Sequence, residues 1–119
     1  MPASVLLISS DLACASSVAG AATRTGATLR TVLSVAAIEG KLTEEKPGLV
    51  LLDLSLAGAA PNEIVPKLRA SLPPDSRILA FGSHVHTRLL AAAREAGCDM
   101  VVSRGEFHAR MDDYLRDVK

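Results

Sequence analysis

The sequence predicts an α/β domain built on a five-stranded parallel sheet with five helices on its two faces. Short apolar runs alternate with longer segments of helical periodicity along all 119 residues. Most of the runs are almost continuously apolar, which is typical of strands covered on both faces of a parallel sheet. A chain of this length fits one compact domain, so we expect residues 1–119 to form a single unit.

Four of the expected strands are rich in Val, Leu and Ile, and one is weaker. The strong runs are residues 5–9, 49–54, 77–81 and 100–103. The weaker run, residues 28–32, alternates polar Thr28 and Arg30 with apolar Leu29 and Val32. This alternation indicates an edge strand.

The first two expected helices follow the first two strands. Residues 11–24 are rich in Ala, with an apolar face that starts at Leu12 and ends before Gly26, a suitable left-handed helix stop. Residues 34–45 place apolar side chains three and four positions apart, and Pro47 closes the segment.

The third expected helix, residues 62–71, contains Pro66. Proline lacks the amide hydrogen that an inner helical turn needs, so we expect the regular helix to begin only near Val65 or Pro66. The last two helices, residues 84–96 and 106–118, each carry an apolar stripe at helical spacing.

Strands and helices that alternate with right-handed crossovers form a doubly wound sheet, for which we expect the flavodoxin-like order 2-1-3-4-5. In such sheets functional groups gather at the carboxyl ends of the strands, where the strand order reverses. The residues expected at those ends are Ser9, Ser10, Asp11, Asp53, Gly82, Ser83 and Arg104.

Composition argues against several classes of function. Thirteen basic residues balance thirteen acidic ones, so direct nucleic-acid binding is not expected. The apolar runs are far shorter than the roughly 20 residues of a membrane helix, and no secretory signal pattern opens the sequence. We therefore expect a cytoplasmic protein that does not enter a membrane. Cys14 and Cys98 are expected to be free thiols.

Three stretches carry a family resemblance: VLLISSD, KPGLVLLDLSLAG and RILAFGSHVHTRLLAAAREAGCDMVVSRGEF. With the closing amphipathic helix, they make the chain resemble a chemotaxis-receiver-like response-regulator receiver domain over essentially its whole length. In that family the Asp that ends the third strand accepts a phosphoryl group from a partner kinase, and this position falls on Asp53. The resemblance implies a signalling domain of a two-component or phosphorelay pathway rather than an enzyme.

The metal site of that family is altered here. Mg²⁺ prefers hard oxygen ligands, and the family supplies an acidic pair at positions that fall on Ser9 and Ser10. Asp11 comes one position later, and we expect Ser10 or Asp11 to cap the first helix. Mg²⁺ binding through Asp11 and Asp53 is therefore expected to be weak, and no cofactor is assigned.

Three further family positions also differ. The Thr or Ser that ends the fourth strand falls on Gly82, with Ser83 beside it. The Lys of the fifth strand becomes Arg104, for which we expect a salt bridge to Asp53. The aromatic residue that reports activation falls on Val101. These changes predict a degenerate pseudo-receiver that works by protein–protein interaction, with weak or no phosphorylation.

The expected partners are signalling proteins, either a histidine kinase or a downstream target. In receivers the face of the fourth helix, fifth strand and fifth helix binds partners or forms homodimers. The residues expected to populate that face here are Arg88, Arg110, Asp113 and Arg116.

Two alternatives stay open. One is a functional phosphoacceptor in which Asp53 is phosphorylated and Asp11 serves as a displaced Mg²⁺ ligand. The other is a small α/β nucleotide-binding protein or enzyme. The sequence offers neither a glycine-rich phosphate loop nor an assignable Ser-His-Asp or Cys-His set for it.

Overall fold

The structure is a computed structural model that describes residues 4–38, 46–56 and 60–118. One sheet of five parallel strands has the order β2-β1-β3-β4-β5. Its strands are β1 (Ser4–Ile8), β2 (Thr28–Val32), β3 (Leu49–Asp53), β4 (Arg77–Gly82) and β5 (Met100–Ser103). The predicted doubly wound α/β fold and its strand order are therefore confirmed.

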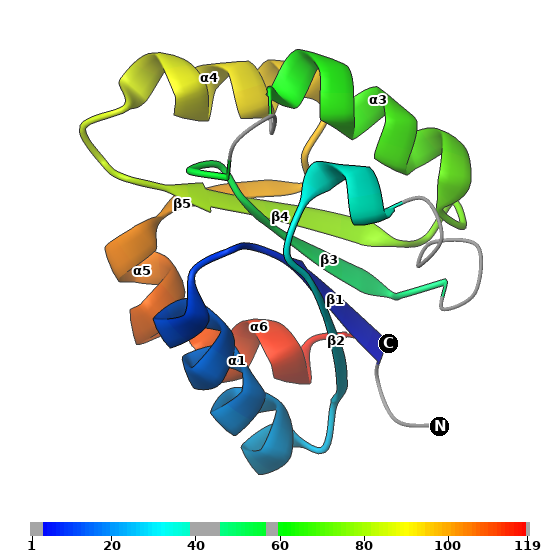
Figure 1. Cartoon of the computed structure of the whole chain (residues 1–119), viewed down its shortest axis with the longest axis vertical. Coiled ribbons are helices and arrows are strands. Elements are labelled where there is room, and N and C mark those ends of the chain that lie inside the picture. The colour runs from blue at the N-terminus through cyan, green and yellow to red at the C-terminus, as the bar shows by residue number, and fades with distance from the viewer. Residues whose placement is uncertain (1–3, 39–45, 57–59, 119) are drawn as a thin grey trace.

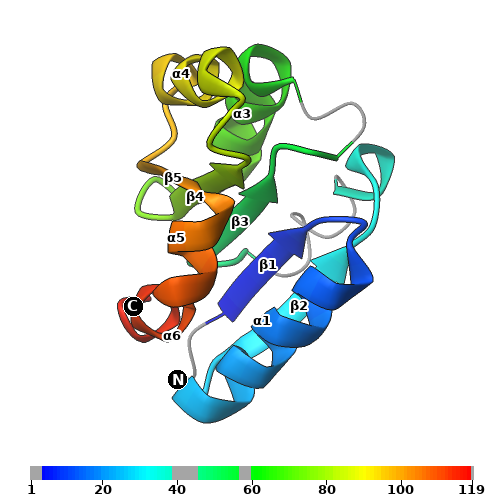
Figure 2. The same ribbon diagram turned by 90° about the vertical axis from the view of Figure 1, so that its left-hand side faces the viewer.

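Helices cover both faces of this sheet (Figure 1). One layer consists of α1 (Leu12–Thr25), α5 (Arg104–Ala109) and α6 (Met111–Arg116). The other consists of the 3₁₀ helix η1 (Val35–Ala37), α3 (Pro61–Ser71) and α4 (Thr87–Ala96). In Figure 2, α3 and α4 lie above the sheet, and α1 and α6 lie below it. No helix among the described residues is long and apolar enough to cross a bilayer.

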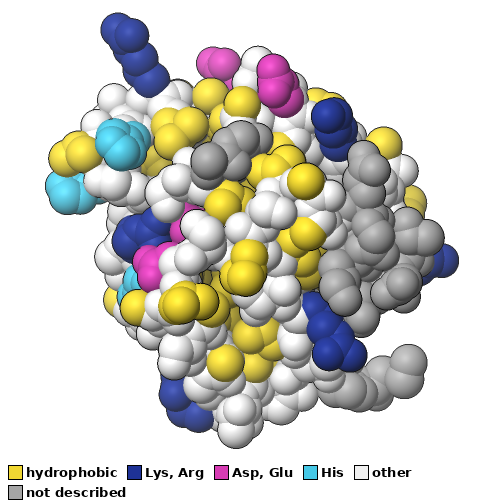
Figure 3. All heavy atoms as spheres, viewed as in Figure 1, with side chains coloured by type: hydrophobic (Ala, Val, Ile, Leu, Met, Phe, Trp, Pro, Cys, Tyr) yellow, Lys and Arg dark blue, Asp and Glu magenta, His cyan; other side chains and the backbone are white. Residues whose placement is uncertain are grey.

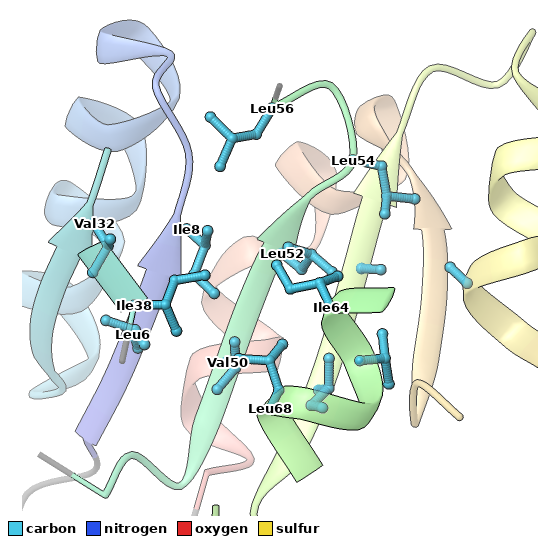
Figure 4. Packing of buried hydrophobic residues seen from close by; sticks show 14 of the residues in the cluster. Leu6, Ile8, Val32, Ile38, Val50, Leu52, Leu54, Leu56, Ile64 and Leu68 are labelled. Carbon is cyan, nitrogen blue, oxygen red and sulfur yellow. The ribbon is translucent and has the colours of Figure 1, made fainter. Parts of the chain in front are cut away.

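Each face of the sheet has its own apolar core, because successive side chains on a strand point to opposite sides. The core toward α3 and α4 includes Leu6, Ile8, Val50, Leu52 and Ile64 (Figure 4). The core toward α1, α5 and α6 includes Val5, Leu7, Leu51, Phe81 and Phe107. β3 is buried along its whole length. Asp53 therefore ends a strand that is covered on both faces.

The buried face of α1 differs from the predicted one. Leu12, expected in the core, is 74% exposed, whereas Cys14 and Ala21 are buried. Alanine is only weakly apolar and occurs all around this helix, so the sequence does not define the buried face sharply. Both ends agree with prediction, since Asp11 caps the start and Gly26, with φ of 77°, ends the helix.

The expected late start of α3 is wrong. The helix begins at Pro61, where a missing amide hydrogen costs nothing because the first helical turn has no internal acceptor. Pro66 lies inside the helix, and its ring leaves the carbonyl of Asn62 without an amide donor. Asn62 is exposed, so water can satisfy that carbonyl.

The last two helices also differ from their expected bounds. α4 begins at Thr87 rather than His84, because His84 lies in a turn closed by a hydrogen bond from His86 N to Ser83 O at 3.0 Å. The C-terminal helix begins at Arg104, earlier than expected, and is broken at Arg110, where ψ is 18°. Phe107, Met111 and Leu115 are buried on the two sides of this break.

The second expected helix, residues 34–45, is described only up to Ile38. That part contains the single 3₁₀ turn η1 rather than a regular α-helix. Residues 39–45 lie outside the described residues. Both cysteines are free thiols, Cys14 buried and Cys98 partly buried.

Candidate functional site

Asp53 lies at the carboxyl edge of the sheet, where polar residues that end or follow β1, β3 and β5 come together. Its side chain is 1% exposed, although it ends a strand whose other residues are all apolar. Ser9 follows β1 on one side of β3, and Arg104 follows β5. The topology therefore places these three side chains at the reversal point expected for function.

Four hydrogen bonds reach the Asp53 carboxylate. Its Oδ2 accepts one from Ser9 Oγ at 2.7 Å. Its Oδ1 accepts from Ser55 N at 2.9 Å, from Ser55 Oγ at 2.6 Å and from Arg104 Nη2 at 2.8 Å. A buried carboxylate is tolerated only when it is paired and hydrogen-bonded, and this one is both. The salt bridge expected between Arg104 and Asp53 is present.

Arg104 joins the rest of the site to this carboxylate. Its Nη2 also donates to Ser55 Oγ at 3.1 Å, and its Nη1 lies 3.9 Å from Asp11 Oδ2. The guanidinium carbon lies 5.3 Å from the ring centroid of Phe81, within the range of a cation–π contact. The planar guanidinium thus contacts two carboxylates, a hydroxyl and a ring.

The Asp53 carboxyl remains a strong acid in this environment. Burial raises its pKa, whereas the hydrogen bonds from Ser55 and Ser9 and the charge of Arg104 lower it. The lowering contributions win, so the pKa lies below the ordinary value. The side chain is therefore ionised at neutral pH and forms a closed ion pair with Arg104.

This pKa shift predicts an acid-dependent loss of stability that Asp53→Asn removes. A carboxyl whose pKa is lower in the folded state stabilises the fold fully above its unfolded pKa, about 3.9. That stabilisation disappears as pH falls through the folded pKa. Urea denaturation at pH 6 and at pH 3 should therefore show that the free energy of unfolding falls less between these two pH values for Asp53→Asn than for the wild type. Glu63→Gln, which removes an exposed carboxylate from α3, is the control for loss of one charge. If the free energy of unfolding falls equally between pH 6 and pH 3 in Asp53→Asn and in wild type, the prediction is wrong.

The residues of the predicted metal pair lie in different environments. Ser9 is fully buried and bonded to Asp53, whereas Ser10 is exposed. Asp11 Oδ1 accepts hydrogen bonds from Ala13 N at 3.0 Å and Cys14 N at 3.2 Å. Asp11 is therefore engaged as the cap of α1.

The resemblance implies Mg²⁺, and the donor set here does not fit that cation. Both oxygens of Asp53 already accept hydrogen bonds, and Ser9 and Ser10 supply no negative charge. Among the described residues, no three His, Cys, Asp or Glu side chains are grouped to hold a metal ion. Arg104 supplies the positive charge beside Asp53 instead.

The end of β4 offers no hydroxyl to this site. A Cβ added to Gly82 would lie 3.3 Å from Leu54 Cβ, so Leu54 fills the space beside that glycine. The hydroxyl of Ser83 accepts a long hydrogen bond of 3.4 Å from Val85 N. Val101 packs against the core on the α3 and α4 side. Within the described chain, none of these three residues donates a hydrogen bond to the Asp53 carboxylate.

The expected partner-face residues lie on two layers. Arg88 is exposed on α4, whereas Arg110, Asp113 and Arg116 are exposed on or beside α6, across the sheet. Asp113 pairs with Arg116 at 3.5 Å. On the face seen in Figure 3, acidic and basic side chains are scattered rather than gathered into one patch of either sign.

One member of the site, Ser55, was not expected from the sequence. Ser55 makes two of the four hydrogen bonds to Asp53, and an Asp followed two positions later by Ser is a known turn signal that could have indicated it. Cys14 is buried beside the same charges, and burial together with the Asp53 carboxylate raises the pKa of its thiol. This placement agrees with the sequence, which predicts Cys14 early in the first helix, near the carboxyl end of the sheet.

The large apolar side chains that are exposed among the described residues also belong to this edge. Leu12, Leu33 and Val85 are 74%, 56% and 65% exposed. They follow β1, β2 and β4, so all three lie at the carboxyl ends of the strands, as Asp53 does.

No family model and no curated protein matches the sequence, whereas solved structures match its fold. A signal receiver domain of a response regulator from Bermanella marisrubri aligns with a TM-score of 0.83 and 19% identity, over 99% of this chain and 98% of that one. A CheY-like receiver domain protein from Methanospirillum hungatei JF-1 aligns with a TM-score of 0.79 and 16% identity, over 97% and 94%.

A third similar structure is a Burkholderia pseudomallei response regulator with a phosphorylated aspartic acid, calcium ion and citrate. It aligns with a TM-score of 0.81 and 20% identity, over 98% of this chain and 66% of that one. At these identities the likeness concerns the fold. The chain has the fold of response-regulator receiver domains.

Proposed function

We propose that this chain is an atypical receiver-type signalling domain of the two-component or phosphorelay kind, which acts by protein–protein contact and is not phosphorylated on Asp53. The observation that carries the proposal is the hydrogen bond of 2.8 Å from Arg104 Nη2 to Asp53 Oδ1. The fold of receiver domains supplies the signalling context.

Phosphoryl transfer to a carboxylate places demands that these residues do not meet. The attacking oxygen needs a free lone pair directed at phosphorus, and cations must neutralise the charge that gathers on the phosphoryl oxygens. Asp53 Oδ1 already accepts three hydrogen bonds, and Oδ2 accepts one from Ser9. The guanidinium of Arg104 brings one positive charge where a divalent cation would bring two. The carboxylate is therefore stabilised in place rather than prepared to attack.

A receiver-type domain without phosphoryl chemistry signals through its surface. Leu12, Leu33 and Val85 each expose apolar area at the carboxyl edge of the sheet, and a partner protein docked on this edge would bury that area. The partners we propose are signalling proteins, a histidine kinase or a downstream target. A homodimer through the face of α4, β5 and the C-terminal helices α5 and α6 belongs to the same proposal.

One observation favours the second candidate, a functional phosphoacceptor. The side chain of Asp11 is 47% exposed and its Oδ2 lies 3.9 Å from Arg104 Nη1, so a carboxylate does lie beside the site. To bind a cation it would have to leave the cap of α1. For that reason we rank this function second.

The proposal predicts no Mg²⁺-dependent phosphorylation. Wild type and Asp53→Ala are incubated with acetyl phosphate and Mg²⁺, and intact mass is measured under acid conditions that preserve acyl phosphates. We expect no gain of one phosphoryl mass in either protein. Beryllofluoride with Mg²⁺ should likewise leave amide NMR shifts near Asp53 unchanged.

A receiver domain known to accept phosphate from acetyl phosphate serves as the positive control. A mass gain in wild type that Asp53→Ala abolishes would overturn the proposal and support the second candidate. In that case Asp11→Asn should abolish the gain as well. A gain that persists in Asp53→Ala would place the phosphate elsewhere on the chain and would also contradict a purely contact-based function.

A further inference from the structure

Arg104 lies between two carboxylates at the carboxyl edge of the sheet. Its Nη2 donates to Asp53 Oδ1 at 2.8 Å, whereas its Nη1 lies 3.9 Å from Asp11 Oδ2, which is too far for a hydrogen bond. Nη1 is buried and has no hydrogen-bond partner within the described residues. A buried donor without an acceptor costs free energy, so the position beside Asp53 does not satisfy the whole guanidinium.

The Asp11 carboxylate offers this guanidinium a second position. The side chains of Arg104 and Asp11 are 30% and 47% exposed, so solvent surrounds part of each. Asp11 Oδ1 caps α1 through Ala13 N and Cys14 N, and within the described chain no hydrogen bond reaches its Oδ2. An outward rotation of the guanidinium would therefore bond Nη1 to Oδ2 and leave the cap in place.

In its position beside Asp53 the guanidinium also covers an aromatic ring. Its carbon lies 5.3 Å from the ring centroid of Phe81, within the range of a cation–π contact. Arg104 is the first residue of α5, and Phe107 belongs to the same short helix. Outward rotation would give up the contact with Phe81 at the point where α5 begins.

Phe81 is the first of three rings that form a continuous row along this layer. Phe81 on β4 stacks on Phe107 of α5, with centroids 4.1 Å apart and planes 9° apart. Phe107 in turn lies parallel to Tyr114 of α6, with centroids 6.3 Å apart and planes 6° apart. Both Phe rings are fully buried. Chains of packed side chains of this kind can carry energetic coupling when one end has two discrete arrangements.

The row ends at the opposite end of the sheet from Asp53. Tyr114 lines a cavity there together with Leu49 and Ile78, at the amino ends of β3 and β4. Its neighbours Asp113 and Arg116 are exposed and belong to the surface proposed above to meet partners. The row therefore connects Arg104 at one edge of the sheet to the α6 surface at the other.

We propose that Arg104 is a two-position switch: it bonds Asp53 while that carboxylate is charged, bonds Asp11 when the charge is neutralised, and transmits its position to α6 through the three rings. The inference rests on the proposed function only for the role of α6 in the partner surface. A basic side chain of a docked signalling protein is the input that the charges select, because displacing Arg104 without replacing its cation would strand the buried carboxylate of Asp53.

The far end of the row carries its own reporter. Tyr114 is the only tyrosine of the chain, so incorporation of 3-fluorotyrosine gives one ¹⁹F NMR resonance. Asp53→Asn stands in for the neutralised carboxylate, and we expect it to shift this resonance by more than its linewidth. Adding Asp11→Asn should return the resonance to its wild-type position, because the second carboxylate is gone while asparagine still caps α1. Asp11→Asn alone should leave the resonance unchanged, as should Glu63→Gln, which removes an exposed carboxylate from α3.

Two further variants test the cation and the ring row separately. Arg104→Gln removes the cation from both positions, so it should shift the resonance in the same direction as Asp53→Asn, and adding Asp11→Asn should not reverse that shift. This variant also keeps the test decisive if Asp53→Asn does not fold. Phe107→Leu interrupts the row, so the resonance should be the same in Phe107→Leu with and without Asp53→Asn. Far-ultraviolet circular dichroism verifies the fold of each protein.

The proposal is wrong if the resonance keeps its wild-type position in both Asp53→Asn and Arg104→Gln. It is also wrong if the shift caused by Asp53→Asn survives the addition of Asp11→Asn or of Phe107→Leu. These measurements contain no phosphoryl donor, so their outcome is separate from the test of phosphorylation on Asp53.

Discussion

Replacing Phe107 with Ala should lower the free energy of unfolding by about 4 kcal/mol. Phe107 is fully buried, and its ring stacks on Phe81 with centroids 4.1 Å apart and planes 9° apart. The chain has two Phe, one Tyr and no Trp, and Tyr114 lies parallel to Phe107 at a centroid distance of 6.3 Å. The aliphatic neighbours cannot fill the space of a ring, so the truncation leaves a cavity between α5 and β4.

Urea denaturation followed by far-ultraviolet circular dichroism measures this loss. Phe107→Leu is the matched variant, since it keeps most of the apolar volume and should cost about 1.5 kcal/mol. The dependence of unfolding free energy on urea should be the same in all three proteins if the fold is kept. A loss under about 1 kcal/mol for Phe107→Ala would mean that α5 does not depend on this stack.

Replacing Arg104 with Ala should lower the free energy of unfolding at pH 7 by about 3 kcal/mol. The substitution leaves the ionised carboxylate of Asp53 buried, with only Ser9 and Ser55 as donors. It also removes the cation from above the Phe81 ring. Arg104→Lys keeps the charge but not the two contacts of Nη2, and should cost about 1 kcal/mol.

A double-mutant cycle with Asp53→Ala isolates the ion pair. Once the carboxylate is gone, loss of Arg104 strands no buried charge, so the double variant should be more stable than additivity predicts by about 2 kcal/mol. The same urea titrations provide all four values. If the loss of stability in the double variant equals the sum of the losses in the two single variants, Arg104 acts through packing alone. That result would remove the main support for its role beside Asp53.

The fold could be predicted from the sequence because the strands are short, apolar and regularly separated by helices. Val50, Leu51 and Leu52 are buried whichever way they point, so their continuous apolar pattern carries the signal of a central parallel strand without ambiguity. The order of the strands then follows from right-handed crossovers. Local sequence and global fold agree along the sheet.

Helix faces and helix ends were less predictable, because they depend on tertiary contacts. Leu12 is apolar by sequence but lies at the start of α1, beyond the end of β1, and stays exposed. Just after the break at Arg110, Asp112 of α6 pairs with Arg24 of α1, a residue that lies far away in the chain. Periodicity within one segment cannot report such distant partners.

The candidate site was partly predictable. Strand topology placed Ser9, Asp53 and Arg104 at one edge, because each lies at the carboxyl end of a strand of the same parallel sheet. The roles of the other residues at this edge depended on the direction in which each side chain points. Asp11 is used as a helix cap, and the Ser83 hydroxyl is bonded to Val85, neither of which is fixed by position along a strand.

The strand order also has a consequence for how the chain acquires its structure during synthesis. β1 pairs with β2, which is near in sequence, but its other edge pairs with β3, where Val5 lies beside Leu49. At about 5–20 residues per second, a ribosome needs several seconds to make the residues between Val5 and Leu49. Over that interval one edge of β1 has no partner strand, and β3 likewise lacks a partner on one edge until β4 has been made. The nascent chain is therefore most exposed to aggregation before its central strand emerges, and a chaperone that covers Val5–Ile8 in that interval would do most to protect it.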